Sequence, residues 1–172
     1  MSMPLLITKE ILLSMMETFT VYDSPFGLLR IEYDGDCIIG IKKERGEALE
    51  RGERTAFTEE VVRQLEEYFV GKRQTFDFPY EMRGTAFQLK VWEALCQIPY
   101  GEIRSYKDIA VAVGSPKASR AVGMANNKNP ILLVVPCHRV IGADGRLVGY
   151  GAGLEMKESL LEMERVISAR DK

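Results

Sequence analysis

The chain has few of the side chains that build metal sites and disulfide frameworks. Its 172 residues include one histidine, His138, and three cysteines, Cys37, Cys96 and Cys137. The cysteines are odd in number, widely spaced and form no C-x-x-C pair, so we expect neither a disulfide framework nor a zinc knuckle. The single histidine also argues against a site with several histidine ligands. We therefore expect no metal, no cofactor and a reducing, cytoplasmic setting.

Long apolar runs are also lacking. No stretch approaches the roughly 18 residues of a membrane span, so we expect no membrane partner. Near the start, Ile11-Leu12-Leu13 follows Lys9-Glu10, and no small-residue cleavage site comes after it. We interpret this run as a short strand or a ragged N-terminus rather than a signal peptide. The apolar fraction of 46% can fill a core of ordinary globular type.

The net charge is small, but the charges are unevenly distributed. The whole chain carries −2. Residues 100–149 contain seven basic and three acidic side chains, a net charge of +4, so the remainder carries −6. A basic segment attached to an acidic one is typical of a nucleic-acid binder with a localised footprint. Chance clustering of solvated charges is the alternative.

The first half of the sequence is patterned for strands followed by one helix. Apolar and polar residues alternate from Phe19 to Lys43, with turn residues between the runs, which predicts a small antiparallel sheet. An amphipathic helix is predicted over Thr58 to Phe69, closed by Gly71. We expect a small α/β structural domain over residues 1–80, followed by a linker at 79–84.

The second half is predicted to be a mainly helical domain over residues 84–172. Thr85 followed three residues later by Gln88 is a capping-box pattern, and Ser105 with Asp108 repeats it. A helix should begin after each of these pairs. The last helix is predicted over Leu154 to Ala169, from its apolar spacing.

Two short helices in this half form a helix-turn-helix candidate. The first ends at Gly114, and the second is predicted to begin at Ser115-Pro116, because proline is tolerated at the first helical position. Its apolar stripe is Ala118, Ala121, Val122 and Ala125. Small residues, Gly123 among them, would let the backbone approach a nucleic-acid groove closely. A tightly packed core helix would explain the alanines but not Lys117 and Arg120 beside them.

The segment Pro136-Cys137-His138-Arg139 carries the chemistry that the sequence offers. The apolar run 131–135 before it predicts a buried strand, which Pro136 ends. A thiol in a positively charged neighbourhood is stabilised as a thiolate, and its pKa can fall from about 8.5 to roughly 3.5–7.5. A buried, inert thiol is the alternative reading of Cys137. For Cys37 and Cys96 we expect the inert, buried state.

To act as a base, His138 needs contact with the Cys137 thiol and a second group that accepts a hydrogen bond from its imidazole. In an extended segment its side chain would point away from that of Cys137, so contact between them requires a turn or a bridging water. Glu164 is the candidate acceptor on the other side, because it shares a helix face with Leu160, Leu161 and Ile167. A buried carboxylate needs a partner. A carboxylate that reaches solvent at the edge of the apolar stripe is the alternative.

Ordered motifs across nearly half of the chain resemble the O6-alkylguanine-DNA alkyltransferases. They run from Gly84 to Glu164 and comprise Gly84-Thr85-Ala86-Phe87-Gln88, Val91-Trp92, Ile98-Pro99-Tyr100-Gly101, Ser105-Tyr106, Ala118-Ser119-Arg120-Ala121-Val122-Gly123, Asn129-Pro130, Val135-Pro136-Cys137-His138-Arg139-Val140-Ile141-Gly142, Gly149-Tyr150 and Gly153-Leu154. Several motifs in family order and at family spacing are far more specific than a lone tripeptide.

The resemblance implies a single-turnover repair reaction on DNA. Cys137 would accept the alkyl group of O6-alkylguanine, and of O4-methylthymine as well. His138, acting through water and held by Glu164, would take the thiol proton. Asn129 would brace the active-site turn. The reaction would end in a thioether on the protein, which makes the chain a stoichiometric and self-inactivating methyltransferase.

The resemblance also implies how DNA is held. A monomer would bind duplex DNA through the minor groove. Tyr106 would rotate the 3′ phosphate and push the damaged base out, and Arg120 would enter the vacated space. Further residues placed at this surface are Lys117, Ala121, Gly123 and Arg139.

The pocket for the flipped base would be lined by Tyr106, Val140, Tyr150 and Gly151. One departure concerns metal, because relatives with a structural zinc use N-terminal cysteine and histidine ligands and the only histidine here lies in the active motif. Two other functions stay open on the residues alone. One is a cysteine hydrolase, and the other is a non-catalytic damage sensor or helix-turn-helix regulator.

Overall fold

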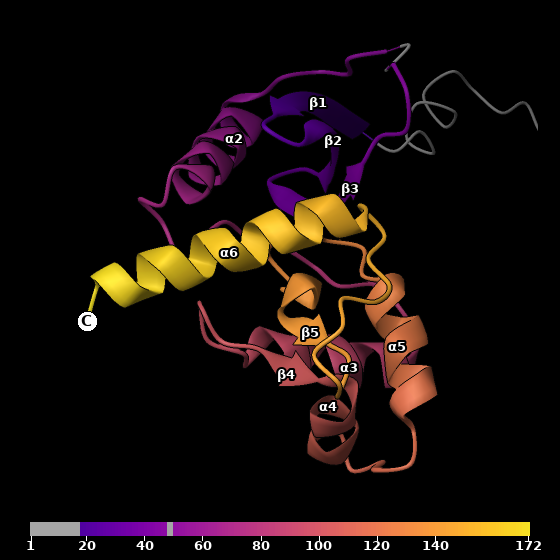
Figure 1. The fold of residues 1–172 in the computed structure, drawn as a ribbon. Coiled ribbons are helices and arrows are strands. Elements are labelled where there is room, and N and C mark those ends of the chain that lie inside the picture. The colour runs from indigo at the N-terminus through magenta and orange to yellow at the C-terminus, as the bar shows by residue number, and fades with distance from the viewer. Residues whose placement is uncertain (1–17, 48–49) are drawn as a thin grey trace, which may run out of the picture.

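The structure is a computed structural model that describes residues 18–47 and 50–172 (Figure 1). The run Ile11-Leu12-Leu13, for which we expected a short strand or ragged N-terminus, lies outside the described residues. Within those two ranges, no helix is both long enough and apolar enough to cross a bilayer.

The predicted N-terminal sheet is confirmed as three antiparallel strands. These are β1 (Thr18–Ser24), β2 (Gly27–Asp34) and β3 (Cys37–Lys43), in the order β1-β2-β3. Leu29, Ile31 and Tyr33 alternate along β2 and are all buried, as a sheet with one packed face requires.

Helix α2 (Ala56–Phe69) packs against this sheet and begins two residues before its predicted start. Thr55 caps it, because the Thr55 side chain accepts from the Thr58 amide while the Thr58 side chain accepts from the Thr55 amide. The buried face contains Val61, Val62, Leu65 and Tyr68. This face extends beyond the sheet, because Tyr68 reaches the C-terminal half of the chain.

The C-terminal half is helical as predicted. Its elements are α3 (Ala86–Cys96), β4 (Arg104–Ser105), α4 (Tyr106–Ala112), α5 (Ser119–Asn127), the 3-10 helix η1 (Cys137–Arg139), β5 (Val140–Ile141) and α6 (Leu154–Arg170). Both predicted capping boxes are present, at the starts of α3 and α4. The short strands β4 and β5 pair in parallel and connect η1 to the start of α4.

The predicted start of α5, with Pro116 as the first helical residue, is wrong by three residues. The Ala118 amide donates to the Ser115 carbonyl at 2.8 Å, which closes a turn over Pro116-Lys117, and the helix begins only at Ser119. The apolar stripe is also narrower than expected. Val122 and Ala125 are buried together with Asn126, whereas Ala121 is exposed.

The apolar run 131–135 is buried almost throughout but is not the predicted strand. Its start pairs with β3, because the Ile41 amide donates to the Pro130 carbonyl at 2.9 Å and the Leu132 amide donates to the Ile41 carbonyl at 3.0 Å. Leu133 then turns the chain with a φ of 73°, and the Val135 amide donates back to the Ile131 carbonyl at 3.0 Å. Burial followed from composition, but the backbone path depends on the partners at both ends.

Helix α6 lies between the sheet layer and the other C-terminal helices (Figure 1). Near its N-terminal end the Lys43 amine of β3 donates to the Ala152 carbonyl at 3.2 Å. Near its C-terminal end Ile167 covers Gly71 so closely that a Cβ at position 71 would not fit. One cluster of buried residues runs from the sheet through α3 to α6. The division into domains at residues 80 and 84 stays a prediction, and this core is continuous across it.

Candidate active site

The segment Cys137-His138-Arg139 folds as one turn of 3-10 helix, not as an extended strand end. The Cys137 amide donates to the Val135 carbonyl at 2.8 Å, and the Arg139 amide donates to the Pro136 carbonyl at 3.0 Å. All three side chains are buried. The turn supplies the local geometry that the sequence required for Cys137 and His138 to face one site.

The Asn129 side chain fixes this turn through hydrogen bonds. Its Nδ2 donates to the Val135 carbonyl at 2.7 Å and to Cys137 Sγ at 3.0 Å, while its Oδ1 accepts from the Ile131 amide at 2.9 Å. Asn126, which the sequence analysis missed, donates from Nδ2 to the Cys137 carbonyl at 3.3 Å. Two amides on or beside α5 therefore fix both the backbone and the sulfur of Cys137.

Glu164 is buried and accepts hydrogen bonds from three parts of the chain. His138 Nε2 lies 2.7 Å from Oε1, and Arg139 donates from Nε to Oε2 and from Nη2 to Oε1, each at 2.8 Å. The Gly101 amide lies 3.3 Å from Oε2, and the Tyr68 hydroxyl donates to Oε1 at 2.6 Å. The alternative of an exposed carboxylate is thereby excluded.

These donors decide the protonation state of the pair. Burial alone would raise the pKa of Glu164, but hydrogen bonds from His138 and Arg139 hold it well below its usual range. Burial lowers the pKa of His138, with the nearby Glu164 opposing that shift. The imidazole is then neutral with its proton on Nε2, facing the carboxylate. Nδ1 is an acceptor, and among the described residues no group hydrogen-bonds to it.

Cys137 is a buried thiol rather than the free-standing thiolate expected from the sequence. Burial raises its pKa to about 11, while the hydrogen bond from Asn129 and the charge of Lys157 both act to lower it. The direction is opposite to the expectation, because the burial of the thiol outweighs both of these effects. A proton acceptor close to the sulfur is therefore needed before it can act as a nucleophile.

Lys157 is another residue of this site that the sequence analysis missed. It is fully buried, and its Nζ donates to the carbonyls of Val140 at 2.5 Å and Val148 at 3.2 Å. Burial lowers its pKa to about 8, with Cys137 opposing that shift. The signal was available, because Lys157 lies seven residues before Glu164 on the same apolar face of α6.

Arg139 does not lie at a DNA-facing surface, which corrects its predicted role. The residue is 7% exposed, and besides both Glu164 oxygens it donates from Nη1 to the Ile98 carbonyl at 2.8 Å. All of these contacts point inward. Its charge compensates a buried carboxylate, and this leaves none for a phosphate.

The other residues predicted to contact DNA lie on or beside the outer face of α5. Lys117, Arg120 and Ala121 are exposed, and Gly123 is half-buried. An added Cβ at Gly123 would lie 3.8 Å from the Tyr106 ring, so this ring stands directly beside the helix. Met124 is 71% exposed on the same helix. The face therefore combines cations, small residues and one exposed apolar side chain.

The predicted pocket residues lie around Lys157. Its Nζ is 6.0 Å from the ring centroids of both Tyr106 and Tyr150. Val140 and Tyr150 are buried, Tyr106 is half-buried and Gly151 is exposed. The Tyr106 hydroxyl donates to the Val148 carbonyl at 2.8 Å, and among the described residues the buried Tyr150 hydroxyl has no partner.

The remaining cysteines differ from expectation in one respect. Cys37 and Cys96 are each partly exposed, and only Cys137 is buried. Burial raises the pKa of Cys96. We expected Cys37 and Cys96 to be buried, and that expectation is wrong: Cys37 is the first residue of β3 and Cys96 the last residue of α3, and each is partly exposed there.

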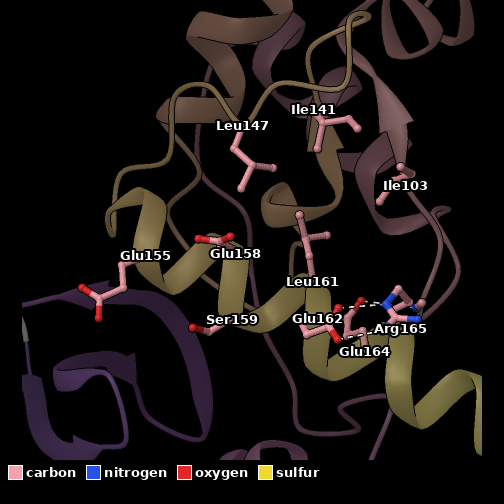
Figure 2. A pocket seen from close by; sticks show the side chains of 11 residues that line it. Ile103, Ile141, Leu147, Glu155, Glu158, Ser159, Leu161, Glu162, Glu164 and Arg165 are labelled. Atoms are coloured by element: carbon pink, nitrogen blue, oxygen red, sulfur yellow. Dashed lines mark hydrogen bonds and ion pairs between the residues drawn. The ribbon is translucent and has the colours of Figure 1, made fainter.

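A cleft of about 800 Å³ opens beside α6, and its lining includes Gly101 and Glu164 but not Cys137 (Figure 2). Its floor includes Ile141, Leu147 and Leu161, while Glu155, Glu158 and Glu162 stand along α6. These carboxylates would repel a phosphate backbone. The cleft is therefore unsuited to nucleic acid, and the face of α5 is the better candidate.

Two family models match the chain in succession. The 6-O-methylguanine DNA methyltransferase ribonuclease-like domain matches residues 18–82, and the 6-O-methylguanine DNA methyltransferase DNA binding domain matches residues 86–166.

Individual relatives agree with these models. The methylated-DNA–protein-cysteine methyltransferase of Methanosarcina acetivorans is 46% identical over 85% of this chain and 97% of its own length. The crystal structure of Mycobacterium tuberculosis O6-methylguanine methyltransferase is 44% identical, covers 88% of this chain and 94% of its own, and superimposes with a TM-score of 0.80. A structure of the M. tuberculosis protein in complex with DNA is also 44% identical, covers 87% and 94%, and gives 0.77.

Proposed function

Because this chain belongs to the 6-O-methylguanine DNA methyltransferase family, we propose that it repairs O6-alkylguanine in duplex DNA by moving the alkyl group irreversibly onto Cys137. One observation carries the assignment of the acceptor. The Cys137 sulfur is held by Asn129 in the same buried turn as the His138 imidazole. Nδ1 of that imidazole has no hydrogen-bond partner within residues 18–47 and 50–172, and its Nε2 faces an ionised carboxylate. That is the arrangement an activated nucleophile needs.

The reaction moves one proton and one alkyl group. His138 Nδ1 takes the Cys137 proton through a bridging water, and the imidazolium is stabilised by Glu164. The sulfur attacks the alkyl carbon, a new C–S bond forms, and the C–O6 bond breaks with its electron pair left on the guanine. A hydrogen bond from the Tyr106 hydroxyl or a nearby backbone amide stabilises the negative charge that develops on the guanine. The guanine then takes up a proton from solvent, and the imidazolium of His138 releases its proton to solvent. The repaired guanine can again pair normally in the duplex, and the thioether remains on the protein.

The sulfur is buried, so the damaged nucleotide has to leave the stack to reach it. Flipping costs a few kcal/mol, which contacts to the protein must offset. We assign Arg120 to the vacated space and Tyr106 to the rotated 3′ phosphate, with α5 in the minor groove. The exposure of Arg120, Lys117 and Ala121 and the small residue Gly123 support this placement. Cationic contacts also make the binding sensitive to salt.

The flipped base is assigned to the space bounded by Tyr106, Val140, Tyr150 and Gly151. The Tyr150 hydroxyl, which has no partner in the part of the chain that the structure describes, is available to this base. Contacts at Gly151 come through the backbone alone. By its resemblance to the family, the chain also repairs O4-methylthymine. The chain acts as a monomer, in a reducing cytoplasm where Cys137 stays a thiol.

The direct test uses duplex DNA that contains O6-methylguanine. The protein is incubated with a molar excess of this duplex, and the tryptic peptides are weighed. We expect the Cys137 peptide to gain one methylene, with the gain saturating at one per protein and an equal loss of methylated base. Cys137→Ala should abolish transfer and retain DNA binding. Cys96→Ala, a loss of another thiol outside the site, should transfer normally.

Other outcomes identify the competing functions. Binding to the methylated duplex with the DNA left unchanged by fresh, reduced protein would identify a damage sensor. Repeated turnover on a small ester without gain in mass would identify a cysteine hydrolase. Either result overturns alkyl transfer to Cys137.

A further inference from the structure

The N-terminal segment contributes one side chain to the buried group around Glu164. Tyr68 lies on α2, 96 residues before Glu164, and is fully buried. Its hydroxyl donates to Glu164 Oε1 at 2.6 Å and lies 3.4 Å from His138 Nε2. The pKa of this tyrosine is raised well above its ordinary value, first by burial and then by the charge of Glu164, so the phenol is a proton donor throughout the working range.

Three donors share the oxygen that faces His138. Oε1 accepts from Tyr68 at 2.6 Å, from His138 at 2.7 Å and from Arg139 at 2.8 Å. Arg139 also donates to Oε2, so its bidentate pair of hydrogen bonds holds both carboxylate oxygens toward the guanidinium. The Tyr68 hydroxyl pulls on Oε1 from a different element. Without it, the bidentate fork is free to draw the carboxylate away from the imidazole.

We propose that Tyr68 is a positioning residue of the alkyl-transfer reaction, through which the N-terminal segment holds Glu164 against His138. The inference rests on the proposed alkyl transfer. It gives the N-terminal segment a part in the proton transfer, beyond covering the back of the C-terminal helices. Tyr68 touches neither the sulfur nor the base. It acts by keeping the His138 proton on Nε2 and the imidazole in one orientation, so that Nδ1 stays available.

The test is Tyr68→Phe in the full chain, which removes one oxygen and keeps the ring. Tyr33→Phe is the matched control, because Tyr33 is another buried tyrosine of the N-terminal segment whose hydroxyl donates, to the Glu53 carbonyl at 3.1 Å, away from the site. Single-turnover transfer from methylated duplex is measured for both variants and for the unaltered protein. We expect Tyr68→Phe to slow transfer about tenfold, as for a lost hydrogen bond to a charged group, with DNA affinity unchanged.

The single histidine provides a readout that a purely structural role would not move. With nitrogen-15 histidine the imidazole spectrum contains His138 alone. In Tyr68→Phe the Nε2–H proton signal should shift upfield, toward that of an imidazole with a weaker hydrogen bond, while Tyr33→Phe leaves it in place. A protein with 3-fluorotyrosine at position 68 keeps the shape and the donor, and should restore both the rate and the signal.

Each outcome decides the matter. Transfer at the unaltered rate in Tyr68→Phe overturns the proposal. Slow transfer in Tyr68→Phe with an unchanged His138 signal also overturns it. So does an equal loss of transfer rate in Tyr33→Phe, because either result indicates a general loss of structure rather than a role for the Tyr68 hydroxyl. If Tyr68→Phe does not fold, the fluorinated protein is decisive, since a loss of its rate contradicts a role for the donor. If the unaltered protein itself transfers no alkyl group, the failure belongs to the proposed function instead.

Discussion

The buried group around Glu164 and the outer face of α5 use charge in opposite ways. Around Glu164 every charge has a partner, and the donors come from α2, η1 and the turn at Gly101. On α5, Arg120 and its neighbour Lys117 stand exposed beside small residues. The first region is organised before any ligand arrives, whereas the second offers its contacts only to a partner. The proposed chemistry and the proposed DNA contacts thus use different sets of charged residues.

Removing the negative charge of Glu164, at the centre of the buried group, should have the largest effect. Glu164→Gln leaves Arg139 buried without its counter-ion and should lower the free energy of unfolding by about 3–5 kcal/mol. Transfer should fall as well. Glu162→Gln is the matched control, because Glu162 lies on the same helix in an exposed pair with Arg165. Urea unfolding measures both variants, and an equal change in the two would contradict the distinction.

The same variant also changes the response to acid. Because the pKa of Glu164 is lowered in the folded state, its contribution to stability is complete above the unfolded value of about 4.3 and is lost as pH falls through the folded value. The unfolding free energy of the unaltered protein should therefore drop steeply below about pH 4.3. Glu164→Gln should lack that part of the slope. Parallel curves for the two proteins would count against an ionised Glu164.

A smaller effect is expected at the boundary between the two regions, where Lys157 faces Cys137. The charge of Lys157 lowers the pKa of the thiol, so Lys157→Met should raise that pKa and displace the pH–rate profile of transfer toward alkaline pH. A displacement of one unit slows transfer about tenfold on the rising limb. Single-turnover rates across pH measure it, with the exposed Lys90→Met as control. A profile that stays in place would exclude this electrostatic role.

On the recognition face a lost cation should act through binding. Arg120→Ala should weaken affinity for methylated duplex and reduce the slope of log affinity against log salt by about one, since one cationic contact is removed. Transfer should slow further because nothing fills the vacated stack. Arg165→Ala, on the acidic side of α6, should leave the salt slope unchanged. Fluorescence titrations at several salt concentrations would show equal slopes for both variants if α5 were not the interface.

The smallest effect is expected from one added methyl group on α5, which should change stability and DNA affinity in opposite directions. Gly123→Ala places a Cβ at ordinary contact distance, 3.8 Å, from the Tyr106 ring. Alanine in a helix interior should stabilise the fold by about 0.5–1 kcal/mol. DNA affinity should nevertheless decrease a few-fold, because the helix backbone is held farther from the groove. Thermal melting and DNA titration together measure this, and unchanged affinity would mean that α5 makes no close approach.

Local patterns were sufficient for much of the fold. The capping pairs Thr85–Gln88 and Ser105–Asp108 act within one helical turn, so neighbouring residues alone determined where α3 and α4 begin. Alternation likewise determined the β1–β3 sheet. The start of α5 was misplaced because Pro116 suits a turn and a first helical position equally well. The run 131–135 was correctly expected to be buried, but its turn depends on Asn129 and β3.

By itself, the sequence marked Cys137 and His138 through their motif and made Glu164 a candidate through its helix spacing, while Asn129 joined them through the family resemblance. Tertiary structure decided where each charge points. Arg139 turns inward because Glu164 arrives from 25 residues away, and Tyr68 joins them across 96 residues. Lys157 lies beside the thiol because the start of α6 packs against β5. Periodicity reports which side of a helix is buried, but the partner on that side, and hence the protonation state, depends on elements distant in sequence.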